Sequence, residues 1–188
     1  SIIFCNSKFN SSKQRKILMA KLNLLKRIFN TGPLILLYFL SISEVDTNLE
    51  KTFEIFTFNL PIIIIYFWIL KRPSTIGTGH IFVAGIINDV IMGFPLGISS
   101  LSYLVVCFFS NYVRNKSVNT TIASDWFTFL IALIFANFVF FLLLINFSDV
   151  IISYSKIGYN TFFTLFLFPI FWLLFNIYQM NFIGGQDA

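Results

Sequence analysis

The segment "WFTFLIALIFANFVFFLLLINF", residues 126–147, runs for 22 residues without a charged side chain. A membrane-spanning helix needs about 20 mostly apolar residues, because the hydrocarbon core of a bilayer is about 30 Å thick. The whole chain is similarly apolar. Of its 188 residues, 57% are hydrophobic and 11% are charged, whereas a soluble domain has about 25% charged residues. The sequence therefore predicts an integral membrane protein.

The apolar runs are continuous and long, which favours helices, so we predict an all-α membrane domain over residues 28–180. It is predicted to contain six transmembrane helices, at 28–43, 53–70, 76–94, 97–113, 126–147 and 157–180. Pro61 and Pro169 lie inside two of these spans, where we expect each to kink its helix. A neighbouring helix or water is expected to satisfy the backbone carbonyl that Pro169 frees.

The positive charges predict the orientation, because lysines and arginines near the spans are retained on the cytoplasmic side. With six spans and the N-terminus inside, only Lys51 and Lys156 lie outside. The other eleven basic residues then lie inside: Lys8, Lys13, Arg15, Lys16, Lys21, Lys26, Arg27, Lys71, Arg72, Arg114 and Lys116. This bias predicts that both termini are cytoplasmic, with a basic tail at 1–27 and a short tail at 181–188.

The basic tail has two further features. Leu18, Leu22, Leu25 and Phe29 recur at helical spacing among lysines and arginines. This pattern is typical of an amphipathic helix on the anionic cytoplasmic leaflet, or of a simple topology signal continuous with the first span. Met19 opens a plausible translation start, so residues 1–18 are interpreted as an upstream extension.

The sequence predicts no catalytic site, metal site or cofactor. His80 is the only histidine and has no nearby cluster of cysteines or carboxylates, so we interpret it as a polar residue in the first turn of a span. No nucleophile, base and acid are arranged as a catalytic group. Cys5 and Cys107 fall in the tail and in a span, so no disulfide is predicted between them.

Asp89 is the one acid within the apolar stretch "GHIFVAGIINDVIMGFPLGISSL", residues 79–101. Burying a charged carboxylate in a bilayer costs about 2.5–3.5 kcal/mol at its centre, and no lysine or arginine lies within a span. Three arrangements lower this cost: a neutral, protonated acid, hydrogen bonds to nearby polar groups, or the positive end of the fourth helix. The candidate polar partners are Asn88, Ser99, Ser100, Tyr103 and Asn137.

Small residues surround this acid at regular spacing. Gly85, Asp89 and Gly93 are four residues apart and therefore share one helix face, which allows another backbone to approach closely. Pro95 and Gly97 indicate a tight turn into the fourth span. The pattern fits a packing seam with a hydrogen-bonded acid, a face that docks a partner, or a substrate or proton site.

Residues 66–106 resemble the signature region of the rod shape-determining MreD family. The resemblance rests on the run G-x-x-x-D-x-x-x-G-x-x-x-G, formed by Gly85, Asp89, Gly93 and Gly97. Arg72 and Pro73 match the family's proline-containing inner loop. Outside these 40 or so residues, the likeness is limited to length, hydropathy and the basic inner side.

The resemblance implies a non-enzymatic component of the bacterial inner membrane that takes part in cell elongation and peptidoglycan synthesis. The partners it implies are MreC, the MreB filament system, and the polymerase RodA with its transpeptidase. It also implies a fold similar to the S components of energy-coupling-factor transporters. A vitamin-binding S component is therefore the alternative function, and a small flippase or membrane enzyme ranks third. In the scaffold interpretation, Gly85, Asp89, Gly93, Pro95 and Gly97 hold two spans as a close hairpin that contacts MreC.

Overall fold

A computed structural model describes residues 31–42, 59–116, 121–147 and 154–183. Within these ranges the chain is helical and has no strand, which confirms the all-α prediction, and each of the six predicted segments contains a helix. The helices are Thr31–Ile42, α2 (Leu60–Lys71), α3 (Thr78–Met92), α4 (Ile98–Lys116), α5 (Ile122–Phe147) and α6 (Tyr154–Tyr178), and the π-helical turn η2 (Gln179–Ile183) follows α6. The predicted N-terminal tail at 1–27 lies outside the described residues. The predicted C-terminal tail at 181–188 begins within η2, and its residues 184–188 lie outside the described residues.

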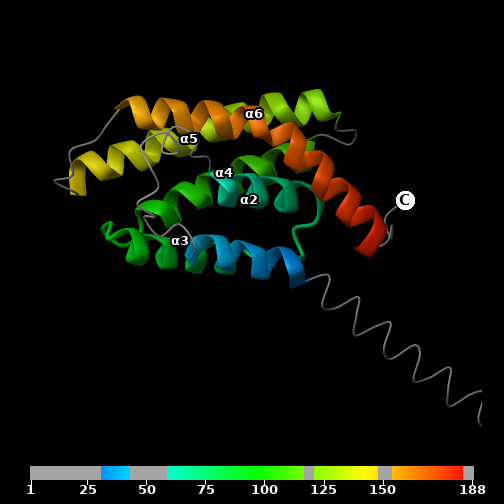
Figure 1. The fold of residues 1–188 in the computed structure, drawn as a ribbon, viewed down its shortest axis with the longest axis horizontal. Coiled ribbons are helices and arrows are strands. Elements are labelled where there is room, and N and C mark those ends of the chain that lie inside the picture. Colours follow the sequence, from blue (N-terminus) through cyan, green and yellow to red (C-terminus); the bar gives the residue numbers. More distant parts are fainter. Residues whose placement is uncertain (1–30, 43–58, 117–120, 148–153, 184–188) are drawn as a thin grey trace, which may run out of the picture.

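The helices form three layers (Figure 1). α2 and α4 lie in the middle, α5 and α6 lie on one side of them, and α3 and the helix Thr31–Ile42 lie on the other. α4 packs against both α3 and α5, and α2 packs against α4 and α6. The middle layer therefore holds the two outer layers together.

α2 is the core of the molecule, and every residue from Pro61 to Leu70 is buried. The Asn59 side chain accepts a hydrogen bond from the backbone N–H of Ile62, which caps the start of the helix. Pro61 therefore lies in the first turn, where its missing N–H costs nothing, and the expected kink at Pro61 is wrong. The prediction was wrong because we placed the start of this span at residue 53, whereas Asn59 caps the helix and α2 begins at Leu60.

Arg72 and Pro73 end α2. Proline disfavours helical geometry in the residue before it, and Arg72 has φ −149° and ψ 79°. The Arg72 N–H still donates to the carbonyl of Trp68 at 2.7 Å, and the Arg72 carbonyl accepts from the Thr75 N–H at 3.0 Å. These two residues of the predicted inner-loop motif thus form the turn between α2 and α3.

Three aromatic rings from three helices meet in the centre of the core. Tyr66 of α2 packs edge-on against Phe129 of α5 and Phe168 of α6, with ring centroids 5.2 and 5.8 Å apart. Phe129 and Phe168 are stacked at 4.1 Å. Such ring pairs contribute about 0.5–1.5 kcal/mol each beyond their burial, so this cluster fixes how α5 and α6 lie on α2.

Two segments, Ile122–Phe147 and Gly158–Asn181, are long and apolar enough to cross a membrane. α2 and α3 are shorter, with 12 and 15 residues. At 1.5 Å per residue they extend about 18 and 22 Å, less than the hydrocarbon thickness of about 30 Å.

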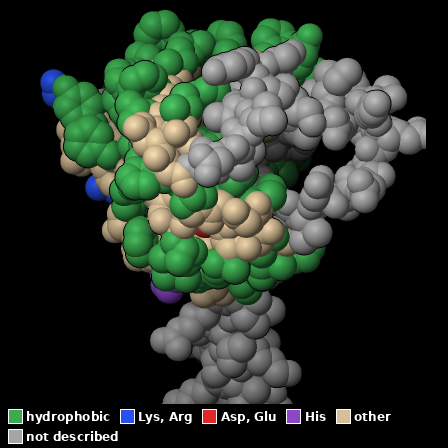
Figure 2. Space-filling model, turned by 90° about the vertical axis from the view of Figure 1, so that its left-hand side faces the viewer, with side chains coloured by type: hydrophobic (Ala, Val, Ile, Leu, Met, Phe, Trp, Pro, Cys, Tyr) green, Lys and Arg blue, Asp and Glu red, His purple; other side chains and the backbone are tan. Residues whose placement is uncertain are grey.

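The described surface is rich in large apolar side chains. In Figure 2 hydrophobic side chains cover most of the coloured surface, and lysines or arginines lie only at its edge. Phe138 of α5 is 61% exposed and Phe162 of α6 is 63% exposed. Exposed apolar surface of this extent indicates contact with lipid or with another protein.

Candidate functional site

Asp89 lies in the last turn of α3 and is fully buried. Its carboxylate accepts a hydrogen bond from the backbone N–H of Gly97 at 2.8 Å and another from the N–H of Ser99 at 2.8 Å. Both N–H groups belong to the start of α4, where the first backbone donors have no partner within the helix. Of the three arrangements expected for this acid, the structure has the one at the positive end of the fourth helix.

The backbone of Asp89 serves the end of its own helix. Its carbonyl accepts hydrogen bonds from the N–H of Gly93 and, at 2.9 Å, from the N–H of Phe94. Gly93 has φ +68°, the left-handed conformation that commonly ends a helix. One residue therefore caps the C-terminus of α3 with its backbone and the N-terminus of α4 with its side chain.

Gly85 is the point of closest approach between α3 and α4. A Cβ atom placed on Gly85 would lie 2.4 Å from the Cα of Ser100 and 2.6 Å from its backbone nitrogen. Among the described residues, apart from the adjacent residues in the chain, no atom lies within 4 Å of a Cβ built on Gly93 or Gly97, and their φ values are +68° and +107°. Gly85 thus provides close packing, whereas Gly93 and Gly97 provide backbone conformations that the turn requires.

Other polar side chains join the two helices beside Asp89. The Asn88 amide donates to Ser99 Oγ at 3.2 Å, and Ser100 Oγ donates to the carbonyl of Phe82 at 3.0 Å. Pro95 lies in the connecting turn, and its carbonyl faces the N–H of Ile98 at 3.5 Å. Asn137 was a candidate partner of Asp89, but it bonds to Thr161 of α6 instead.

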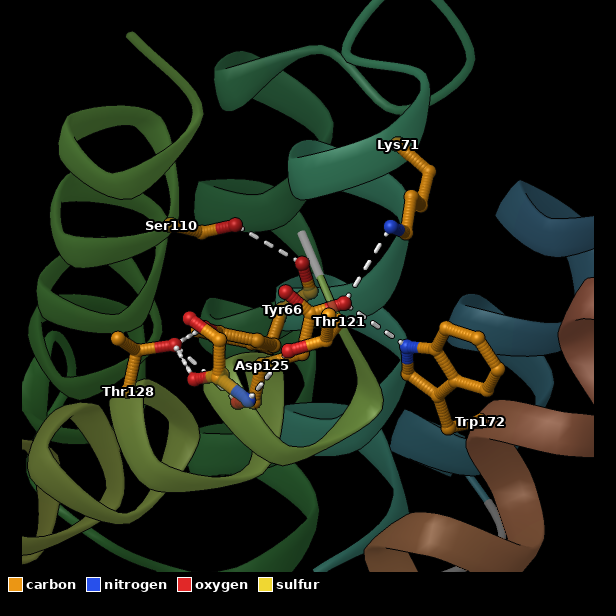
Figure 3. Close-up of polar contacts among 8 residues, drawn as sticks. Tyr66, Lys71, Ser110, Thr121, Asp125, Thr128 and Trp172 are labelled. Carbon is orange, nitrogen blue, oxygen red and sulfur yellow. Dashed lines mark hydrogen bonds and ion pairs between the residues drawn. The ribbon is translucent and has the colours of Figure 1, made fainter. Parts of the chain in front are cut away.

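A second buried carboxylate, Asp125, joins α2, α5 and α6 (Figure 3). Its Oδ2 lies 3.3 Å from Lys71 Nζ and accepts a hydrogen bond from Trp172 Nε1 at 3.1 Å. The Lys71 ammonium also lies 5.6 Å from the centre of the Trp172 ring. Asp125 is fully buried and the Lys71 side chain is 21% exposed, so this ion pair lies at the edge of the core.

Hydrogen bonds beside Asp125 extend the contact between helices. The Tyr66 hydroxyl and Thr128 Oγ1 are 2.5 Å apart, which links α2 to α5. Ser110 Oγ of α4 donates to the Tyr66 carbonyl at 2.8 Å. Figure 3 shows these groups converging on the first turn of α5.

Pro169 lies inside α6, and its missing N–H leaves the carbonyl of Leu165 without its helical donor. Trp126 Nε1 of α5 donates to this carbonyl at 3.1 Å, which confirms that a neighbouring helix satisfies it. The next residue back along α5 is Asp125, which binds Trp172, three residues beyond Pro169. The first turn of α5 therefore makes two indole hydrogen bonds to α6, one on each side of the proline.

Asp125 was not among the predicted site residues, because the fifth span was predicted to begin at Trp126. α5 begins at Ile122, so Asp125 lies in its first turn, where negative charge is favourable. The order of Asp125, Trp126 and a long apolar run could have indicated this position. Nothing in the sequence indicated that Lys71 and Trp172 would be its partners.

His80 lies in the first turn of α3, as predicted, and its Nδ1 is 3.1 Å from the Tyr38 hydroxyl. This contact links α3 to the helix Thr31–Ile42. Within the described residues, no three His, Cys, Asp or Glu side chains are grouped as metal ligands. Cys107 is buried in α4, and Cys5 lies outside the described ranges.

A cavity of about 470 Å³ lies along α5 and the first part of α6. Asn137 and Thr161 are its polar residues, and they are bonded to each other at 2.8 Å. The rest of its lining is apolar: Ile134, Phe138, Phe141, Leu142 and Ile145. Asp89, Asn88 and His80 do not line this cavity.

No protein-family model, no curated protein and no solved structure matches the chain.

Proposed function

We propose that the protein is a multi-pass protein of the bacterial inner membrane, with six membrane helices and both termini in the cytoplasm. The two long apolar helices and the apolar outer surface support a membrane location. The orientation is supported by the ends of α2 and α4, which carry Lys71, Arg114 and Lys116 and point towards the same end of the bundle (Figure 1). The shorter helices would reach the bilayer interface with the help of their flanking residues.

Within this membrane location, we propose a scaffold that acts without catalysis in the cell-elongation machinery. Its partners would be MreC, the MreB filaments, and RodA with its transpeptidase. The observation that carries this proposal is the pair of hydrogen bonds that the Asp89 carboxylate accepts from the start of α4. Both carboxylate oxygens bind backbone N–H groups of α4, so the acid of the MreD-like region serves to hold a hairpin. The α3–α4 hairpin held in this way would present a fixed surface to MreC.

The experiment that tests this proposal is co-purification of the tagged protein with MreC from a rod-shaped host. We expect Asp89→Leu to insert into the membrane at a normal level, to recover much less MreC, and to give rounded cells. The matched control is Val90→Leu, at a neighbouring side chain that is 63% exposed. Full recovery of MreC and normal shape with Asp89→Leu would contradict the proposal.

An S component that binds a vitamin-like molecule remains the alternative. It requires a polar chamber, and the polar residues expected to line one were Asp89, Asn88, His80 and Asn137. Asn137 is the only one of these four that lines the cavity along α5, and that lining is mostly apolar. Rescue of a deletion strain by the nutrient alone would favour this alternative over the scaffold.

A further inference from the structure

The part of α6 before Pro169 is firmly attached to its neighbours. Thr164 is fully buried and accepts a hydrogen bond from the Asn59 backbone N–H at 2.9 Å, at the start of α2. Thr161 bonds to Asn137 of α5, and Phe168 stacks on Phe129 in the aromatic core. Backbone, side-chain and ring contacts thus hold this part of α6 on two helices.

The part beyond Pro169, residues 170–181, is attached in another way. Its aromatic rings lie against α2, with Trp172 and Phe175 on Phe67, and with Phe175 and Tyr178 on Trp68. The hydrogen bond from Trp172 to Asp125, beside the Lys71–Asp125 ion pair, is a polar attachment of this segment. We name the cluster of Lys71, Asp125 and Trp172 the latch.

Some buried polar atoms in and beside residues 170–181 have no hydrogen-bond partner in the described part of the chain. Asp125 and Trp68 contact this segment, and Gln179 belongs to it. Asp125 Oδ1, Trp68 Nε1 and Gln179 Oε1 are buried, and none has a hydrogen-bond partner among the described residues. A buried polar atom without a partner has lost its hydrogen bonds to water, which raises the free energy of this position of the helix. The position that residues 170–181 occupy in the structure is therefore less stable than a fully hydrogen-bonded arrangement would be.

Pro169 provides the point about which this movement can occur. Prolines are the usual cause of sharp bends in helices, and α6 changes direction part-way along its length (Figure 1). No backbone hydrogen bond joins Pro169 to Leu165, because proline has no N–H, and Trp126 of α5 supplies a donor to the Leu165 carbonyl instead. Bending at Pro169 therefore breaks no backbone hydrogen bond at that position.

We propose that residues 170–181 form a hinged arm that swings about Pro169 between a closed and an open position, and that the latch holds it closed. Opening would uncover Phe67 and Trp68, which are now 0% and 1% exposed. The arm would thus give the membrane domain two states and a concealed aromatic face on α2. This inference goes beyond the scaffold role and does not depend on it.

Spin-label distance measurements in lipid nanodiscs test the arm directly. In a background with Cys5→Ala and Cys107→Ala, one label at Val90→Cys in α3 is paired with a second label on the arm at Ile177→Cys. The control pair joins Val90→Cys to Phe166→Cys, before the proline. All three labelled side chains are exposed, at 63%, 55% and 62%. Trp172→Phe keeps the ring of the latch and removes its N–H donor.

We expect Trp172→Phe to raise the ratio of open to closed distances for the Val90–Ile177 pair about tenfold or more, the factor for one hydrogen bond to a charged acceptor. The Val90–Phe166 distance should not change. Asp125→Ala removes the acceptor of the latch, so it is the second latch variant and should act like Trp172→Phe.

Unchanged distances for the Val90–Ile177 pair in the latch variants would overturn the proposal. Equal broadening of both label pairs would also overturn it, because that result indicates general loosening instead of an arm. If only one latch variant is recovered as a folded, monodisperse protein, its distances decide the outcome.

Discussion

Asp89 Oδ1 lies 2.8 Å from the backbone nitrogen of Ser99, so a side chain in the last turn of α3 caps the first turn of α4. Helix-capping side chains usually come from the residue just before the helix. In this protein the chain has to turn between the two helices, and the cap comes from the helix before the turn. The cap therefore fixes the hairpin as well as the start of α4.

Removal of this cap is expected to destabilise the fold. Asp89→Ala leaves the N–H groups of Gly97 and Ser99 without an acceptor and should lower the free energy of unfolding by about 3 kcal/mol. Asp89→Asn keeps one acceptor oxygen and should cost about half as much. Denaturation in mixed micelles, followed by helical circular dichroism, measures both. Val90→Ala is the control, and an effect of Asp89→Ala no larger than that of the control would contradict the cap.

Close packing at Gly85 gives a second prediction. A methyl group at this position would meet the backbone of Ser100, so Gly85→Ala should push α3 away from α4 and cost about 2 kcal/mol. Gly79→Ala is the matched control in the same helix, because a Cβ at Gly79 has no atom of another described segment within 4 Å. Melting temperatures of the two variants in the same detergent make the comparison. If Gly79→Ala lowers the melting temperature as much as Gly85→Ala does, close packing at Gly85 is excluded as the cause of the destabilisation.

The turn after α3 depends on the left-handed conformation of Gly93. Gly93→Ala should cost about 1 kcal/mol, because a side chain with a Cβ disfavours φ +68°. Gly93→Asn should cost less, since asparagine tolerates this conformation. The same denaturation in mixed micelles ranks the wild type, Gly93→Asn and Gly93→Ala by their free energies of unfolding. Equal stability of the alanine and glycine forms would show that the strain is absent.

The hydrogen bond from Trp126 to Leu165 gives a double-mutant prediction. Trp126→Phe leaves the Leu165 carbonyl without its donor and should cost about 1 kcal/mol. In a Pro169→Ala background the backbone N–H of residue 169 can bond to this carbonyl, so Trp126→Phe should then cost little. The coupling between the two substitutions is the measured quantity. Additive effects would show that the indole does not compensate for the proline.

The sequence predicted these features to different degrees. The regular spacing of Asp89 and the glycines beside it indicated a close hairpin. Local spacing determines which side chains share a helix face, so this feature can be found in the sequence. The freed carbonyl at Pro169 was predicted because the chemistry of proline requires it. The identity of its donor, Trp126, could not be predicted, since it depends on how α5 lies on α6.

Contacts between distant segments were the main omission. Asp125 binds Lys71 and Trp172, which lie 54 residues before it and 47 residues after it, and no local pattern indicates such a pairing. The position of Pro61 within its helix was predicted wrongly for a simpler reason. Apolar residues also occur in the sequence before Leu60, so hydropathy alone does not show that α2 begins there.

The most direct test of the central claim is amide hydrogen exchange at Gly97 and Ser99, measured by NMR on the protein in nanodiscs. We expect both N–H groups to exchange slowly in the wild-type protein. In Asp89→Ala both should exchange at least about tenfold faster, while amides in the middle of α2 keep their protection. Fast exchange at Gly97 and Ser99 in the wild type, or the same slow exchange in Asp89→Ala, would contradict this claim.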